Sequence, residues 1–210
     1  IEKNSLAQSS INESESILIQ GGWLIDSVNE GRRRNSGIII QDGKIAAIDI
    51  NKGKSSIAVS RIINLSDSET ILPGMIDMHA HYNFDLVDVG RVEEVINNGL
   101  IFLANGVTST WSAGEYYPER VIKQRDLIES GEKVGPRLFN SGPYFGAFRC
   151  EYAIKTAEDD CLAWPNDISE QEIRNEVNKW AQQGVISIKI KQASPGEAKV
   201  IIEQAHKNGM

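Results

Sequence analysis

The chain has 210 residues, of which 40% are hydrophobic and 24% are charged, a composition typical of a folded globular protein. Its net charge of −7 argues against a nucleic-acid partner, since the only basic cluster is Arg32-Arg33-Arg34, which we interpret as a solvated loop. No apolar run approaches the roughly 18 residues of a membrane-spanning helix, so no membrane partner is expected and the chain as given is expected to be soluble.

Residues 1–16 are rich in Ser and Asn and are predicted to form a flexible tail. They lack the charged and then apolar layout of a secretory signal, so the cytoplasm is the default compartment and an extracytoplasmic one stays open. Cys150 and Cys161 could form one disulfide, but two cysteines make no disulfide framework, and we interpret them as packing or surface residues.

Residues 17–73 are predicted to form a small β domain, as part of a β-sandwich. Short β-rich runs follow one another from Ile17, with a Gly21-Gly22 turn between the first two. An Asp42-Gly43 pair separates the apolar runs 38–40 and 45–48, which is a strong signal for a tight hairpin. The pattern favours a small antiparallel sheet.

After Pro73 the pattern alternates between strands and helices. Two capping boxes, Ser169 with Glu172 and Ser194 with Glu197, mark helix starts. Residues 141–167 have no clear period and are predicted to be a long loop, a type of segment that is often functional. The strands that follow the first one are expected at 107–111, 137–140 and 185–190, and the helices at 89–105, 118–130, 169–184 and 194–209.

Four strand-helix units in residues 74–210 indicate a parallel sheet with right-handed crossovers. They fill about half of the roughly 250 residues of a closed barrel, so we expect the first half of a TIM (β/α)8 barrel in the α/β class. An open doubly wound sheet is the alternative. The absence of a glycine-rich phosphate loop after any strand weighs against it.

His79 and His81 are the strongest candidates for chemistry. Side chains alternate along a strand, so both imidazoles point the same way, as two ligands of one metal must. They end the first barrel-type strand, where active sites of such barrels lie. The alternative is a pair of half-buried histidines satisfied by hydrogen bonds.

These residues also carry a family resemblance. Residues 72–81, LPGMIDMHAH, resemble the PG-[LM]-ID-x-HxH signature of the amidohydrolase superfamily. The DGKI turn at 42–45, GVTST at 106–110 and GPR at 135–137 are similar to further motifs of that family, in the same order. The run GVISIKI at 184–190 resembles that of the prolidase-like and imidazolonepropionase-related branch, so the likeness extends over about 17–210.

The resemblance implies a metal centre in which His79 and His81 bind the more buried ion. It also implies that Lys189 is carboxylated and bridges a second ion, so we expect one or two divalent ions of the zinc type. The residues alone leave Lys191 open, because it lies on the same strand face, and a surface lysine is the alternative for either position.

The implied activity is hydrolysis of an amide or other C–N bond by a metal-activated hydroxide, with a dipeptide or N-acyl amino acid as substrate. A cyclic-amide hydrolase, a deaminase that needs no Lys189, and a non-catalytic scaffold are the alternatives. The remaining ligands, two histidines and a general-base aspartate, are expected after residue 210. His206 is expected at a solvated helix end.

Tyr82, Trp111 and Tyr144 follow strand ends and are predicted to contact substrate, with aromatic loop packing as the alternative. Relatives often have Arg-Asp where this chain has Trp111-Ser112, which leaves the substrate class open. The expected partner is a small-molecule substrate. The rest of the barrel is expected from residues beyond 210 or from another chain, and a homo-oligomer is left open.

Overall fold

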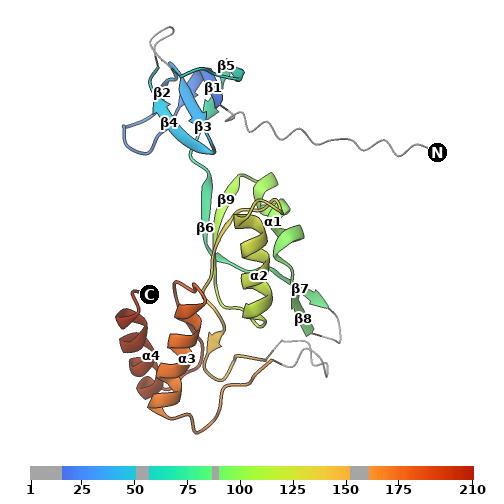
Figure 1. Ribbon diagram of the computed structural model, residues 1–210, viewed down its shortest axis with the longest axis vertical. Coiled ribbons are helices and arrows are strands. Elements are labelled where there is room, and N and C mark those ends of the chain that lie inside the picture. The colour runs from blue at the N-terminus through green and yellow to red at the C-terminus, as the bar shows by residue number, and fades with distance from the viewer. Residues whose placement is uncertain (1–15, 51–56, 87–89, 152–160) are drawn as a thin grey trace, which may run out of the picture. The chain divides into compact units, whose positions relative to one another are not determined.

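The computed structural model describes residues 16–50, 57–86, 90–151 and 161–210 (Figure 1). The chain divides into two compact units, Ile1–Pro73 and Gly74–Met210, and each is described by itself. Apart from Ser16, the predicted tail lies outside the described residues. None of the helices in the described ranges combines the length and the apolar character needed to cross a membrane.

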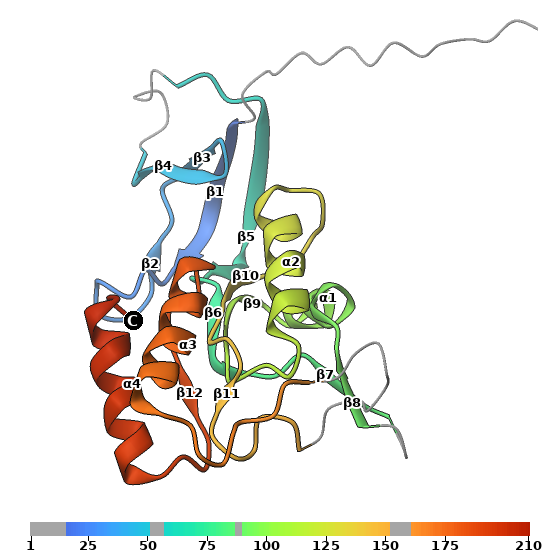
Figure 2. The same cartoon turned by 60° about the horizontal axis from the view of Figure 1, so that its bottom comes forward.

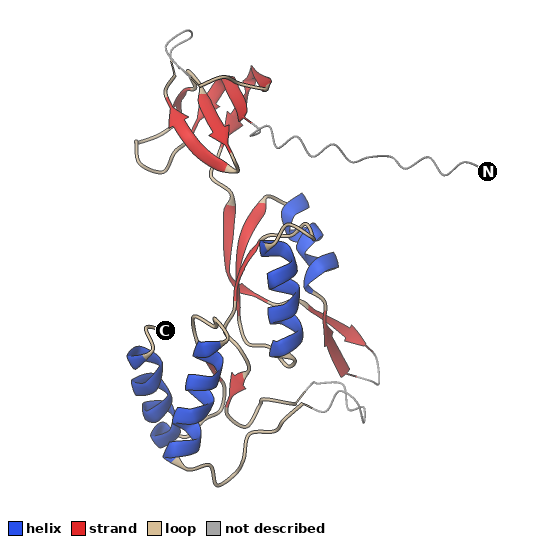
Figure 3. Ribbon diagram, viewed as in Figure 1, coloured by secondary structure: helices blue, strands red, loops and turns tan. Residues whose placement is uncertain are grey.

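The first unit is a five-stranded sheet built around β1 (Ser16–Leu24) (Figure 3). β1 pairs in antiparallel orientation with β2 (Arg33–Arg34) and β3 (Ile38–Gln41), and β3 pairs with β4 (Lys44–Ile48). β5 (Arg61–Ile71) pairs with β1 in parallel orientation. The prediction of an antiparallel sheet is therefore wrong for β5, because the sequence pattern shows strands but not which strand a later one joins.

The hairpin between β3 and β4 is confirmed. Gln41 pairs with Lys44, and the two turn residues, Asp42 and Gly43, have φ values of 51° and 71°. Two successive positive φ angles give the turn twist that matches a two-residue hairpin. The described strands of this unit form a single sheet, so the predicted β-sandwich is not confirmed.

The second unit begins with a parallel sheet in the order β10-β9-β6. Its strands are β6 (Met75–Ala80), β9 (Val107–Ser112) and β10 (Arg137–Phe139). Farther along the chain, β11 (Tyr144–Phe145) pairs in parallel with β12 (Lys189–Ile190). The α/β class is confirmed, and the described strands form partial sheets.

The fourth predicted strand is shorter than expected. It was predicted over 185–190, whereas only Lys189–Ile190 form β12. Before β12 the backbone N–H of Ile186 donates to the carbonyl of Asn140 at 3.2 Å, so this segment follows the third strand without a regular ladder. Consecutive parallel neighbours in chain order are what the first part of a barrel requires.

The first predicted helix starts later than expected. The structure has a hairpin of β7 (Asn83–Leu86) and β8 (Gly90–Glu93), and α1 covers only Val95–Ala104. The side chain of Glu94 accepts the N–H groups of Ile96 and Asn97 and so fixes the start of α1. Gly106, with a φ of 81°, follows the helix end as predicted.

The other helices agree closely with the predictions. They are α2 (Pro118–Glu129), α3 (Glu170–Gln182) and α4 (Pro195–Lys207), and both predicted capping boxes are present. Figure 2 shows α3 and α4 side by side. On α4, Val200 and Ile201 are buried, whereas Ile202 is 46% exposed.

Two apolar clusters position the site. The first packs α1 and α2 against the sheet and consists of Ala80, Tyr82, Val95, Val121 and Leu138. The second lies around α3 and α4 and consists of Phe145, Trp164, Ile173, Val177, Trp180, Val185, Val200, Ile201 and Ala205. Helices thus cover one face of the sheet, and alternate strand residues leave the opposite face.

The two cysteines form a disulfide, which corrects their interpretation as packing or surface residues without a bond. Cys150 and Cys161 have Cα atoms 5.6 Å apart and are both half-buried. They pack against the buried pair Tyr116 and Tyr144. The bond therefore ties two parts of the long predicted loop to each other.

Candidate metal centre

His79 and His81 lie next to each other at the end of β6. Ala80 between them is 1% exposed and belongs to the helix-side cluster, whereas both histidines are exposed, and His81 lines a pocket together with Asn98 and Phe102 of α1. Their ring centroids are 5.2 Å apart and the ring planes are 70° to each other. The prediction that they point the same way agrees with this geometry.

A local irregularity accompanies the histidine pair. The register between β6 and β9 shifts between Asp77 and Ala80, and the carboxylate of Asp77 accepts the N–H of His79 at 2.9 Å. Bulges of this kind re-aim side chains next to functional sites. At the start of the strand, a Cβ on Gly74 would overlap the side chain of Thr108, so the glycine of the motif lets β6 and β9 approach.

The two lysines that the sequence left as alternatives differ in their surroundings. Lys191 places its Nζ over the rings of Phe148, at 4.6 Å, and Tyr144, at 5.1 Å. Those contacts hold its cation by cation–π attraction. Lys189 is half-buried in β12, in register with Tyr144. The cation–π contacts thus explain the place of Lys191, and the role of Lys189 in a metal site stays a prediction.

The donor set fits part of a metal site. Two adjacent neutral imidazoles are suitable ligands for zinc and similar ions, which take four or more ligands. The described part of the chain contains no group of three or more His, Cys, Asp or Glu side chains arranged to hold an ion. His79 and His81 would thus provide two of the ligands that such an ion needs, and their role as ligands stays a prediction.

Trp111 of β9 makes two contacts with later segments of the chain. It stacks on Phe139 of the neighbouring strand, with centroids 5.5 Å apart and planes 29° to each other. Its indole Nε1 donates to Ser187 Oγ at 2.7 Å, two residues before Lys189. Thr110 next to it is buried on the helix side, so the side chain of Trp111 leaves the opposite face of β9. Trp111 thus connects β9 to β10 through Phe139 and to the segment before β12 through Ser187.

Tyr82 and Tyr144 lie elsewhere. Tyr82 is buried in the helix-side cluster, where its hydroxyl bonds to Thr110 and burial raises the pKa of its phenol to about 12. Tyr144 is buried against Tyr116, with ring centroids 5.1 Å apart. The structure therefore brings His79 and His81 together, it stacks Trp111 on Phe139, and it places these two tyrosines in packed positions.

Two buried carboxyl groups lie beneath the loop that follows β9. Glu93 accepts the backbone N–H groups of Tyr116 at 2.7 Å and Tyr117 at 2.8 Å, and burial raises its pKa to about 7. Burial raises the pKa of Glu115 to about 8, and the nearby charge of Glu93 acts in the same direction. The sequence pattern did not predict that these two glutamates are buried, because glutamates are normally exposed.

A polar network joins Glu115 to the neighbouring strand ends. Its Oε1 accepts hydrogen bonds from Ser112 Oγ and from Asn140 Nδ2, the latter at 3.1 Å. The hydroxyl of Ser112 in turn accepts the N–H of Ser141 at 2.9 Å, and Arg125 of α2 donates to Asn140 at 3.3 Å. These bonds fix the loops that follow β9 and β10.

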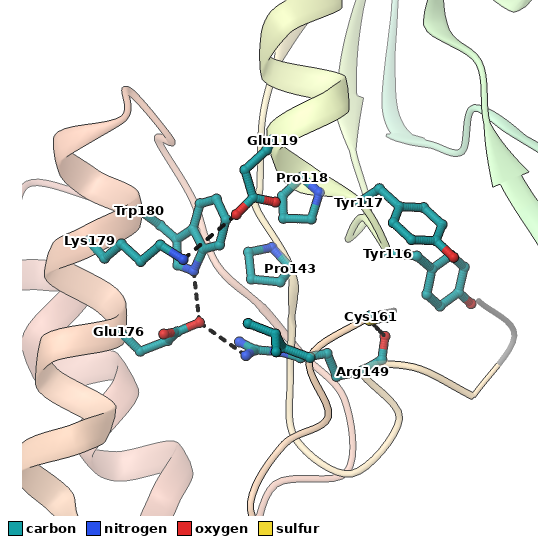
Figure 4. Close-up of a pocket in the computed structure, with 11 residues that line it drawn as sticks. Tyr116, Tyr117, Pro118, Glu119, Pro143, Arg149, Cys161, Glu176, Lys179 and Trp180 are labelled. Atoms are coloured by element: carbon teal, nitrogen blue, oxygen red, sulfur yellow. Dashed lines mark hydrogen bonds and ion pairs between the residues drawn. The ribbon is translucent and has the colours of Figure 1, made fainter. Parts of the chain in front are cut away.

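A pocket of about 200 Å³ lies in the helix layer of this unit (Figure 4). It is bounded by the start of α2, by Pro143 and Arg149 of the long loop, and by Trp180 and its neighbours on α3. It is thus lined by other residues than those of the histidine face.

Comparisons with known proteins place the fold. No family model and no curated protein sequence matches the chain. A solved Xaa-Pro dipeptidase with bound methionine in its active site matches with a TM-score of 0.72 and 23% identity, over 93% of this chain and 55% of that chain. A. niger ochratoxinase matches with a TM-score of 0.65 and 21% identity, over 93% of this chain and 54% of that chain. Phenylurea hydrolase B matches with a TM-score of 0.70 and 17% identity, over the same shares of the two chains.

The chain therefore spans about half the length of the structures that it matches. Its structural neighbours are prolidase and amidohydrolase-superfamily proteins, so the resemblance seen in the motif around His79 and His81 is confirmed in the neighbours of the fold. At identities of 17–23% this likeness establishes the fold, and the activity has to be argued from the site.

Proposed function

We propose that this chain is part of a metal-dependent hydrolase of C–N bonds, in which His79 and His81 hold a divalent ion of the zinc type. One observation carries the proposal: two imidazoles, with ring centroids 5.2 Å apart, lie next to each other at the end of the first parallel strand. That position is where (β/α)8 barrels place their catalytic groups, and the structural neighbours include several hydrolases.

The residues of the proposed site have separable roles. His79 and His81 donate ring nitrogens, and Asp77 holds the backbone of His79 in place. Lys189, as a carbamate, would bridge a second ion. Divalent ions held in this way supply a water of lowered pKa and polarise a carbonyl, which is the chemistry that amide hydrolysis needs.

The substrate class proposed is a dipeptide or N-acyl amino acid. The stacked pair Trp111 and Phe139 offers an apolar surface beside the histidines, suited to an uncharged side chain or acyl group. The likeness to a Xaa-Pro dipeptidase supports the same class. The remaining ligands and the general base are proposed to come from residues beyond 210 or from another chain.

The test is metal content and activity in the intact protein. We expect His79→Ala to lower bound zinc and to abolish hydrolysis of a panel of dipeptides and N-acyl amino acids, because two ligands on one strand bind as a unit. His206→Ala is the matched control, since His206 is exposed near the end of α4. Retention of metal and activity in His79→Ala would refute the proposal.

A second pair of variants tests the bridging lysine. We expect Lys189→Ala to lose the second ion and most activity, whereas Lys191→Ala, whose cation lies over Phe148 and Tyr144, keeps both. Full activity with one ion in Lys189→Ala would favour the deaminase-type alternative. If neither ion nor activity is present in the parent protein, the scaffold alternative holds.

A further inference from the structure

The pocket in the helix layer has a buried arginine at its side. Arg149 is 6% exposed, and its guanidinium lies over the rings of Phe145, at 5.2 Å, and Trp164, at 5.0 Å. Its Nε donates to the carbonyl of Tyr144 at 2.7 Å, and its Nη1 pairs with Glu176 at 3.0 Å. Figure 4 shows the guanidinium turned toward Glu176 on α3.

One nitrogen of this guanidinium is left over. Nη2 of Arg149 is buried and has no hydrogen-bond partner among the residues that the structure describes. Leaving buried N–H donors without acceptors is costly, and a planar guanidinium pairs with carboxylate and phosphate groups through parallel N–H donors. Because Arg149 lines the pocket, its guanidinium favours a ligand that carries one of these anionic groups.

The charges around the pocket are balanced. Besides the pair of Arg149 and Glu176, Lys179 pairs with Glu119 across the rim at 3.7 Å, so two basic and two acidic side chains line the cavity. A simple anion would meet both carboxylates. A ligand with one positive and one negative group keeps the balance, since each group finds an opposite charge.

The volume and the apolar walls of the pocket limit the kind of ligand further. A volume of about 200 Å³ is below the usual range of roughly 300–1,000 Å³ for drug-sized ligands. Pro118, Pro143 and Trp180 provide apolar walls between the two ion pairs (Figure 4). We propose that this pocket binds a free α-amino acid with an apolar side chain, its carboxylate on Arg149 and its ammonium group facing Glu119 and Glu176.

This site does not depend on the proposed hydrolase activity, although free amino acids are what hydrolysis of a dipeptide would release. The test is calorimetric titration of the intact protein with L-leucine, N-acetyl-L-leucine and L-leucinamide. We expect L-leucine to bind, and the two blocked analogues to bind at least about tenfold more weakly, because each lacks one charged group.

Variants locate the binding. Glu119→Gln changes a side chain that is 63% exposed, so folding is expected to be kept, and it should weaken L-leucine binding several-fold. Arg149→Lys should weaken it by about tenfold or more, because a single ammonium cannot replace the fork of donors. Lys123→Gln, an exposed change on α2, is the matched control and should bind as the parent does.

The outcomes separate this site from the metal centre. His79→Ala should keep L-leucine binding, whereas binding that is lost in His79→Ala and kept in Glu119→Gln would assign the amino acid to the histidine face and overturn the proposal. Equal binding of N-acetyl-L-leucine, or no binding of L-leucine at all, would overturn it as well. If Arg149→Lys does not fold, Glu119→Gln alone decides.

Discussion

Replacement of Glu115 by Gln should change how the stability of this protein depends on pH. The Glu115 carboxyl is 2% exposed, and its Oε2 is buried without a partner among the described residues. Burial raises its pKa from 4.5 to about 8, so the folded protein holds this group protonated at neutral pH. Gln has the same shape and keeps an acceptor for Ser112 and Asn140, but it does not titrate.

The sign follows from the two pKa values. When the chain unfolds, Glu115 returns to 4.5, so between pH 4.5 and about 8 the folded state binds a proton that the unfolded state lacks. The contribution of Glu115 to the free energy of unfolding is fully present below pH 4.5 and is lost as pH rises through about 8. Since one pKa unit is worth about 1.4 kcal/mol, the loss is about 5 kcal/mol over that range.

The assay is urea unfolding of the intact protein at a series of pH values from 5 to 8, followed by tryptophan fluorescence. We expect Glu115→Gln to be close to the parent at pH 5 and more stable than the parent at pH 8 by about 3–4 kcal/mol, because the assay covers three of the pH units over which the contribution is lost. The variant should keep a smaller dependence of stability on pH, because Glu93, which lies near the charge of Arg120, has a pKa raised to about 7.

Glu129→Gln is the matched control, because Glu129 is exposed at the end of α2. It should keep the pH profile of the parent. If Glu115→Gln also runs parallel to the parent from pH 5 to 8, Glu115 is ionised in the folded protein and the burial argument is refuted.

Two further changes test packing in the same unit. Gly114→Ala should lower the free energy of unfolding by more than about 2 kcal/mol, since a Cβ there would overlap the ring of Tyr144 and the backbone φ is 99°. The control is Gly131→Ala, which has a φ of 79° but open space around it, so it should show only the cost of the backbone conformation. Equal losses for the two variants in urea unfolding would contradict the overlap. Ile201→Ala should lower the free energy of unfolding by about 2–5 kcal/mol, because Ile201 is buried. Ile202→Ala should lower it by less than about 1 kcal/mol, because Ile202 is 46% exposed. Similar melting temperatures for the two variants would refute the assigned buried face of α4.

The parts of the fold that could be predicted from the sequence are those fixed by neighbouring residues. The capping boxes at Ser169 and Ser194 and the turn at Asp42-Gly43 need only side chains and backbone within four residues of each other. The direction of His79 and His81 needs only the alternation of a strand. Each of these features is local, so its sequence signal is complete.

What could not be predicted depends on partners far along the chain. The run from Gly90 to Glu93 fits a helical period, but pairing with 83–86 makes it a strand. β5 joins β1 across the whole first unit, and the burial of Glu115 results from packing against Asn140, 25 residues away. The hydrophobic periodicity of the sequence does not show which distant segments pair, so charged residues near strand ends are predicted to be exposed.

The buried acid network and the strand ends near the proposed metal site are linked along the chain. Trp111 of β9 is next to Ser112, which donates to Glu115 beneath the sheet, and Phe139 is next to Asn140, which donates to the same carboxyl group. An ionised Glu115 in that place would repel Glu93 and loosen both strand ends at once. A loss of activity at alkaline pH could therefore arise beneath the sheet rather than at the metal, and Glu115→Gln, which contacts neither histidine, separates the two causes.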